Sequence, residues 1–206
     1  MRALPLPPGR LADQVRFLLE ADRLKSVLRR TLISDGSRHE NSAEHSWHVV
    51  LFALLLSEHA RESVDMSRVI AMLVLHDLVE IDAGDTYVYD EAGLATKATR
   101  ERAAADRLFG LLPPDQRKVL RGLWEEFDAR ESEDSRFANA VDRLAAVLLN
   151  YLGRGEVWRT HRVSAPQVRA RNSAVGEAAP ALGEVVRVVV DDSVARGWLA
   201  EDRACP

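Results

Sequence analysis

Residues 72–86 read MLVLHDLVEIDAGDT, an apolar run followed at once by a histidine and several acidic residues. The apolar run is too long for an ordinary strand and a glycine supplies a stop, so we expect a helix over residues 68–82. On such a helix His76 and Glu80 are one turn apart, and Asp77 points roughly the same way. A helix that is apolar nearly all round is usually buried, and buried ionisable groups cost free energy unless something neutralises them.

A divalent cation would neutralise these groups, and the negative end of the helix dipole would favour it further. His45 lies on the core-facing side of a helix predicted from about residue 42 to 60. Asp142 lies on the apolar stripe of a helix predicted over residues 133–152, and aspartate is almost never fully buried without a partner. Two imidazoles and two carboxylates on three helices suit a divalent ion such as Mn²⁺, Co²⁺, Fe²⁺, Zn²⁺ or Ni²⁺.

The chain has 206 residues, of which 47% are apolar, and a formal charge of −4 at pH 7. This composition predicts one sizeable domain, and the charge gives no reason to expect nucleic acid or an anionic membrane as a partner. The longest apolar run, residues 49–56, is far shorter than the roughly 20 residues that a membrane span needs. A single cysteine, Cys205, and the lack of a leader-like segment predict a cytoplasmic protein without an internal disulfide.

Outside the charged stretch, the pattern predicts helices joined by short loops. Residues 1–10, with three prolines and a glycine, are expected to form an irregular arm, and residues 32–40 a loop. Further helices are expected over residues 11–28, 95–112, 115–129, 166–175 and 181–196, with a break near Asp22 and a strand at 185–190 left as alternatives. No strand–turn–strand signal is found, so the predicted fold is all-α, a single-domain helical bundle of residues 11–200.

The order His45, His76-Asp77, Asp142 resembles the HD-domain phosphohydrolase superfamily, whose ligand pattern is H…HD…D on an all-helical core. The flanking sequences RHENSAEHS, which ends at Ser46, and HDLVEIDAGD narrow the resemblance. They are similar to the YfbR-like 5′-deoxynucleotidase branch, which carries R-x-E-N-x-x-E-H-S and H-D-x-x-E-x-x-x-G-D. The resemblance implies a metal-binding core of about residues 23–152, followed by C-terminal helices within about 165–198.

The resemblance also implies roles for individual residues. It makes metal ligands of His45, His76, Asp77 and Asp142, non-ligand catalytic acids of Glu80 and Asp85, and phosphate binders of Arg30 and Arg38. A metal lowers the pKa of bound water and polarises the phosphoryl oxygen, and arginine offers a planar fork to phosphate. Glu80 is expected to orient the water or carry its proton, and Asp85 to protonate the leaving oxygen, with the two jobs interchangeable.

The expected function is therefore a metal-dependent phosphohydrolase that releases phosphate from a small phosphomonoester, a nucleoside or deoxynucleoside 5′-monophosphate. Hydroxide on one divalent ion, Mg²⁺ being a further candidate, would attack phosphorus. The resemblance also implies a homodimer. Where the founding branch places a tryptophan after the first phosphate-binding arginine, this chain has Thr31, which leaves the preference for deoxyribose open.

Other interpretations stay open from the sequence alone. A sister activity on nucleoside triphosphates or cyclic nucleotides, a phosphatase specific to one pathway, and a non-catalytic nucleotide sensor fit the same ligands. Among single residues, Glu44 fits a capping box that opens the helix at residue 42, and Arg38 fits an ion pair with Glu40 or Glu44.

Overall fold

The computed structural model describes residues 5–202, and helices dominate it, which confirms the all-α class. The elements are α1 (Arg10–Ala21), η1 (Asp22–Ser26), β1 (Leu28–Leu32), β2 (His39–Asn41), α2 (Ser42–Leu55), η2 (Ser57–His59), α3 (Met66–Leu75), α4 (Glu80–Ala83), α5 (Glu91–Phe109), α6 (Pro114–Ala129), α7 (Glu133–Leu152), α8 (Glu156–Thr160), α9 (Ala165–Ala178) and α10 (Pro180–Ala195). The expected arm is irregular over residues 5–9, while Cys205 and residues 1–4 lie outside the described range.

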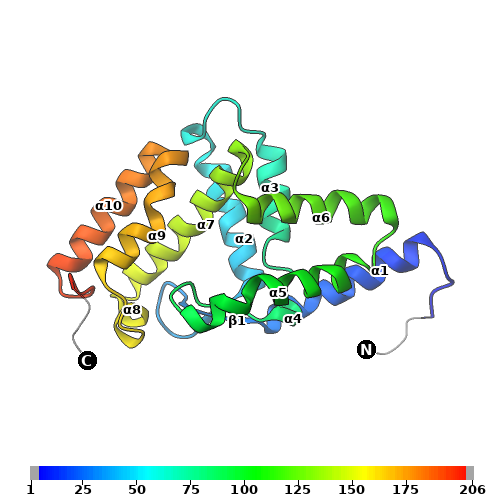
Figure 1. The fold of residues 1–206 in the computed structure, drawn as a ribbon, viewed down its shortest axis with the longest axis horizontal. Coiled ribbons are helices and arrows are strands. Elements are labelled where there is room, and N and C mark those ends of the chain that lie inside the picture. The colour runs from blue at the N-terminus through cyan, green and yellow to red at the C-terminus, as the bar shows by residue number, and fades with distance from the viewer. Residues whose placement is uncertain (1–4, 203–206) are drawn as a thin grey trace.

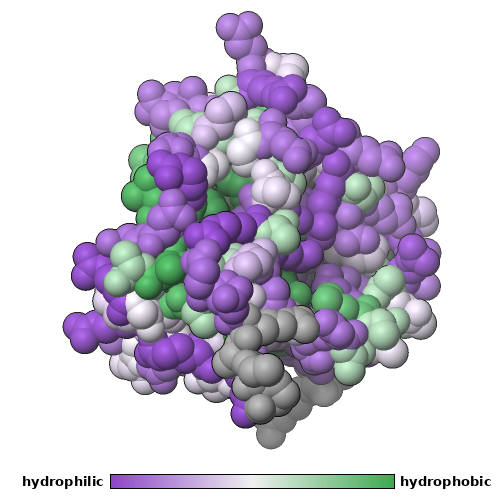
Figure 2. Space-filling model, turned by 60° about the vertical axis from the view of Figure 1, so that its left-hand side comes forward, coloured by the Kyte–Doolittle hydropathy of each residue, from purple (hydrophilic) through white to green (hydrophobic). Residues whose placement is uncertain are grey.

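Helix α7 lies in the middle of the bundle, between α2 and α3 on one side and α9 and α10 on the other (Figure 1). Helices α1, α5 and α6 extend away from α10 along the long axis. The face brought forward in Figure 2, on the side of α9 and α10, is mostly hydrophilic with smaller hydrophobic areas. Within the described chain, no helix is both long enough and apolar enough to cross a bilayer.

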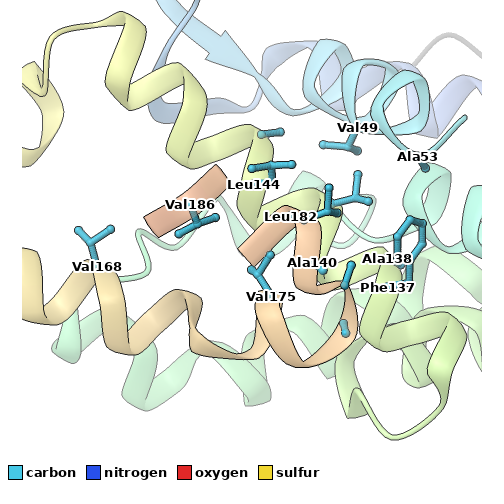
Figure 3. Close-up of a cluster of buried hydrophobic side chains, with 14 of the residues drawn as sticks. Val49, Ala53, Phe137, Ala138, Ala140, Leu144, Val168, Val175, Leu182 and Val186 are labelled. Atoms are coloured by element: carbon cyan, nitrogen blue, oxygen red, sulfur yellow. The ribbon is translucent and has the colours of Figure 1, made fainter. Parts of the chain in front are cut away.

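The larger core cluster surrounds α7 (Figure 3). Val49 of α2, Phe137 and Leu144 of α7 and Leu182 of α10 are all buried there. Burial of each such side chain contributes about 1.5–3 kcal/mol. A second cluster packs Phe17 of α1 with residues of α5 and α6.

The segment from the end of α3 to the start of α4 packs where these two clusters meet. Leu73 belongs to the cluster around α7, whereas Leu75, Leu78 and Val79 belong to the second cluster. His76 and Asp77, between them, are therefore buried where the two cores meet.

The predicted helix of residues 68–82 is wrong in its second half. Helix α3 ends at Leu75, and a tight turn leads to the short α4, whose first residue is Glu80. The backbone amides of Leu78 and Glu80 donate to carbonyls three residues earlier, at 3.1 and 2.9 Å. Such bonds tighten the chain, so His76 and Glu80 do not lie one α-helical turn apart.

The expectation of no strand–turn–strand unit is also wrong, and the loop predicted at residues 32–40 is confirmed only for residues 33–38. Strands β1 and β2 pair antiparallel, with Leu28 opposite Asn41 and Leu32 opposite His39. The turn contains Gly36 at φ 73°, a conformation that favours glycine. Asp35-Gly36 is a hairpin signal, although neither flanking strand has an alternating apolar pattern.

The ends of the other helices differ from those expected by a few residues. The structure also decides between the two pairs of alternatives that the sequence left open. The break near Asp22 is real, because α1 ends at Ala21 and η1 follows. The strand alternative at residues 185–190 is excluded, since that stretch lies inside α10.

Helices α9 and α10 approach closely at Gly176 and Gly183, where a Cβ on Gly183 would lie 2.4 Å from the Gly176 Cα.

Candidate metal centre

His45 is placed by the start of α2. Asn41 caps the helix by accepting from the amides of Ala43 and Glu44, and the Glu44 carboxylate accepts in return from the Asn41 amide. This capping box fixes where the helix begins, so His45 points inward in the first turn, with 1% of its surface exposed. Its Nε2 lies 2.9 Å from Oδ1 of Asp142 on α7.

His76 is held by the end of α3. Its Nδ1 lies 2.8 Å from the carbonyl oxygen of Leu73, and because a carbonyl only accepts, Nδ1 carries the proton. In the neutral imidazole the other ring nitrogen, Nε2, then carries a lone pair. It is buried, has no hydrogen-bond partner within residues 5–202, and faces Oδ1 of Asp77 at 3.1 Å and Oδ1 of Asp142 at 3.9 Å.

These atoms fit a divalent cation. Ligand atoms of His45, His76 and Asp142 all lie within 4.8 Å of one another. A lone pair turned toward two carboxylate oxygens is unfavourable unless a positive charge lies between them. Imidazole nitrogen and carboxylate oxygen are ligands of borderline divalent ions, and such a donor set does not choose among those ions.

Electrostatics favour a cation at the same point. Burial and the charge of Arg29 lower the pKa of the His45 imidazole, but hydrogen bonds to the carboxylates of Asp142 and Glu40 outweigh both and raise it to about 9. Burial would raise the pKa of Asp142, yet its bond to His45 and the nearby cations hold it well below its ordinary value. The site thus carries carboxylate charge that attracts a proton or a metal.

Arg29 and Glu40, which the sequence did not single out, complete the buried network. Nη1 of Arg29 donates to Oδ2 of Asp77 at 2.7 Å, and Nε lies 3.4 Å from Oε2 of Glu40. Glu40 in turn lies 3.2 Å from Nδ1 of His45. Burial lowers the pKa of Arg29, but the carboxylates of Asp77, Glu80, Asp142 and Asp85 raise it beyond its already high value. Asp77 therefore has one oxygen on Arg29 and the other beside His76.

Glu80 and Asp85 both lie beside this network, and the pKa of each carboxyl is raised. Burial raises the pKa of Glu80 well above its ordinary value, and the charge of Asp77 adds to the effect. The hydroxyl of Ser42 donates to Glu80 at 2.7 Å. Asp85 follows Gly84, whose φ is 73°, and burial raises its pKa as well.

The two predicted phosphate-binding arginines are placed differently. Arg30 is exposed and lines a cavity beside Asp142 and Asp85. Arg38 donates to both carboxylate oxygens of Glu44, at 2.5 and 2.9 Å, and is 54% exposed. It lines neither cavity described next. The simpler interpretation of Arg38, an ion pair at the helix cap, agrees with this geometry.

Two cavities meet at the candidate centre and share Asp85, Asp142, Arg143 and Arg171. The metal-side cavity, of about 660 Å³, is also lined by His76, Asp77, Glu80, Lys97, Phe127 and Arg130. The aromatic cavity, of about 650 Å³, is also lined by Arg30, Thr31, Tyr87, Tyr89, Asn150 and Trp158. The metal-side cavity thus contains the candidate ligand atoms, and the aromatic cavity offers ring surfaces for packing.

Two polar atoms in the aromatic cavity are buried without a hydrogen-bond partner in the described chain, the hydroxyl of Tyr87 and Oδ1 of Asn150. The ring of Tyr87 packs against Tyr89 at 5.3 Å and against His161 at 4.6 Å between centroids. Sequence reasoning missed Tyr87, because nothing in its spacing relates it to His76.

Comparisons with known proteins show the family to which the chain belongs. A model of the HD domain family matches residues 21–183. The protein named 5′-deoxynucleotidase HDDC2 from Mus musculus is 28% identical over 141 residues, which cover 68% of this chain and 69% of that relative. Its Homo sapiens counterpart is 27% identical over 135 residues, so the match covers 65% of each chain, just under two thirds of that relative.

Two solved structures resemble this fold. One is described as a predicted metal-dependent phosphohydrolase from Magnetospirillum magnetotacticum MS-1, and it is 49% identical with a TM-score of 0.88 over 93% of this chain and 98% of that chain. The other, a conserved hypothetical protein from Pyrococcus furiosus, is 20% identical with a TM-score of 0.59 over 85% of this chain and 98% of that chain, and shows similarity of fold alone.

Proposed function

The chain belongs to the HD domain family of metal-dependent phosphohydrolases, and we propose that its own reaction releases phosphate from a nucleoside or deoxynucleoside 5′-monophosphate. The relatives named 5′-deoxynucleotidase support this substrate class. The observation that carries the proposal is Nε2 of His76, a buried lone pair 3.1 Å from Oδ1 of Asp77. A cation would satisfy both atoms.

The proposed ligands are His45, His76, Asp77 and Asp142. Glu40 and Arg29 act as positioning residues, because one lies beside Nδ1 of His45 and the other holds the remaining oxygen of Asp77. Partners of this kind fix the orientation of a ligand and tune its basicity. Mn²⁺, Co²⁺, Fe²⁺, Zn²⁺, Ni²⁺ and Mg²⁺ are the candidate ions, with one ion in each chain.

When bound, such an ion lowers the pKa of a water ligand and polarises a phosphoryl oxygen. Glu80 and Asp85 supply the proton steps. Because burial raises the pKa of both carboxyls, each is a stronger base than an ordinary carboxylate when ionised, and each holds its proton to a higher pH when protonated. We assign Glu80 to the attacking water, since Ser42 orients its carboxylate, and Asp85 to the leaving oxygen.

The aromatic cavity is the proposed site for the nucleoside. Tyrosine and tryptophan rings bury large apolar surfaces, and the orphaned atoms of Tyr87 and Asn150 offer hydrogen bonds to a sugar or base. Thr31 lies in the same cavity, where the founding branch has tryptophan, so the choice between ribose and deoxyribose is made here. Arg30 is the candidate for the phosphate, and Arg38 is a candidate only if it leaves Glu44.

We also propose that the protein acts in the cytoplasm as a homodimer. A low cysteine content suits a reducing compartment. Several large apolar side chains on α2 are exposed, among them Trp47, Leu54 and Leu55, and a second copy would cover them. Sedimentation of the purified chain at several concentrations tests the assembly, and a monomer at every concentration would reject it.

The activity is tested by a phosphate-release screen of the purified protein. Ribo- and deoxyribonucleoside 5′-monophosphates, the matching triphosphates and cyclic nucleotides are each assayed with Mn²⁺, Co²⁺, Mg²⁺ and Zn²⁺. We expect inorganic phosphate from 5′-monophosphates. Pyrophosphate from triphosphates, or ring opening of cyclic nucleotides without phosphate release, would contradict the proposal and favour a sister activity.

A further inference from the structure

Three arginines line the metal-side cavity together with the acidic residues of the candidate centre. Arg130 lies at the C-terminal end of α6, Arg143 on α7 next to Asp142, and Arg171 on α9. All three side chains are half-buried. We call these residues the arginine cluster.

The arginine cluster has no acidic partner. Among residues 5–202, none of its members lies within ion-pair distance of a carboxylate, although most other arginines do. Within residues 5–202, the only hydrogen bond donated by its guanidinium groups runs from Nη1 of Arg143 to the backbone carbonyl of Arg171 at 3.1 Å. Nε of Arg130 is buried without a partner in the described part of the chain. The other two cations that line this cavity are already paired, Lys97 with Glu101 at 2.9 Å and Arg29 with Asp77 at 2.7 Å.

The three charges repel one another. Burial and the charge of Arg130 lower the pKa of Arg171, and Tyr89 and Asp142, which act in the opposite sense, do not reverse the shift. An anion bound between the arginines would relieve this repulsion.

The backbone holds Arg130 in this position. Its φ is 58°, a left-handed conformation that is uncommon for a residue with a side chain. The side-chain amide of Asn139 donates to the carbonyl of Phe127 at 2.8 Å and to that of Ser135 at 2.9 Å, which ties the end of α6 to α7. Strained residues of this kind are found at ligand sites, where the surroundings over-determine them.

We propose that the arginine cluster is a second anion subsite, so that the substrate is a phosphomonoester that carries another phosphate or a carboxylate. This inference rests on the proposed function. If the nucleoside-like body fills the aromatic cavity, the scissile phosphate lies beside Asp142, which lines both cavities. Of these two cavities Arg130 lines only the metal-side one, so its substitution distinguishes a second anion from the scissile phosphate.

The first test counts anions without requiring turnover. Inorganic phosphate is titrated calorimetrically into the full-length, metal-loaded protein. We expect two phosphate ions per chain, and one after Arg130→Gln or Arg171→Gln. Arg187→Gln is the matched control, because Arg187 is exposed and paired with Glu184 and Asp191 on α10. The Arg187→Gln protein should still bind two phosphate ions per chain. A single phosphate ion in the wild-type chain, or two that survive both cluster substitutions, would overturn the subsite.

The second test compares matched substrates and separates the two sources of the anion. A nucleoside 3′,5′-bisphosphate is compared with its 5′-monophosphate, and 3-phosphoglycerate with glycerol 3-phosphate. We expect kcat/KM to favour the doubly anionic member of one pair by at least about tenfold, as a charged hydrogen bond predicts. Arg130→Gln should remove that preference.

Equal losses on both members of a pair would mean that the cluster binds the scissile phosphate, which contradicts the inference. If no ester is hydrolysed, the proposed function fails while the phosphate titration still decides whether the subsite exists. Thermal unfolding of each variant checks that its fold is retained, and a variant that unfolds early is replaced by Arg171→Lys.

Discussion

The guanidinium of Arg29 donates to Oδ2 of Asp77 at 2.7 Å, across 48 residues of sequence. Both side chains are nearly buried, at 13% and 9% exposure. Because Oδ2 is engaged, Oδ1 is the oxygen turned toward Nε2 of His76. This ion pair therefore decides which atom of Asp77 faces the candidate metal centre.

Removal of the arginine should destabilise the fold and loosen the centre. Arg29→Ala removes the buried guanidinium that lies beside Oδ2 of Asp77 and Oε2 of Glu40, so we expect the free energy of unfolding to fall by about 3–5 kcal/mol. Urea denaturation measures the change. Arg30→Ala, at the next and exposed position of β1, should change it by no more than about 0.5 kcal/mol. Equal effects of the two substitutions would refute the role given to Arg29.

Glu80→Gln should affect turnover without affecting metal content. The amide keeps the size of the side chain but cannot transfer a proton as the carboxyl does, so we expect kcat to fall by about 10²–10⁴-fold. Stopped assays of phosphate release and elemental analysis of the same preparation measure both quantities. Glu125→Gln on the exposed surface is the control. An unchanged kcat in the Glu80 variant removes Glu80 from the mechanism.

Phosphate binding by Arg38 requires that its guanidinium leave Glu44. If it does so, Arg38→Ala should raise the KM of phosphorylated substrates by about tenfold with little change in kcat, as loss of a charged hydrogen bond predicts. Steady-state kinetics on the preferred substrate decide the matter. A KM equal to that of the wild-type chain would leave Arg38 only as the partner of a helix-capping carboxylate.

The contact of α9 with α10 can be tested with two glycines. Gly183→Ala places a Cβ 2.4 Å from the Gly176 Cα, and overpacking of this kind should lower the free energy of unfolding by about 1–3 kcal/mol. Gly122→Ala on α6 meets nothing within 4 Å and should instead stabilise the chain, by up to about 1 kcal/mol. Thermal denaturation of both variants measures the difference, and a stabilising Gly183→Ala would show that the two helices are not this close.

Long periodic segments were predictable from sequence, and local breaks were not. The helix over residues 133–152 agrees with α7 at both ends, because capping residues and glycines mark them. The end of α3 at Leu75 was missed, since the apolar pattern continues through Leu78 and Val79 while the backbone tightens. Those two residues pack into the second core cluster, a tertiary contact that no local pattern encodes.

The ligand set could be proposed from sequence because its motif is specific, and the structure brings His45, His76 and Asp142 together. The residues around them were harder to predict. The resemblance pointed to Arg30 and not to Arg29. Neighbouring residues of a strand face opposite ways, so Arg29 lies on the buried side of β1 and Arg30 on the exposed side. The arginine cluster comes from three distant helices, so only the packing of α6, α7 and α9 reveals it.

The metal content of a His76 variant tests the candidate centre most directly. Wild-type protein, His76→Asn and the exposed control His59→Asn are loaded with Mn²⁺ or Co²⁺, desalted, and analysed by plasma mass spectrometry. We predict one ion per chain in the wild type and the control, and loss of nearly all metal in His76→Asn at unchanged helical content. Full metal occupancy in folded His76→Asn would contradict the assignment of this buried lone pair as a ligand.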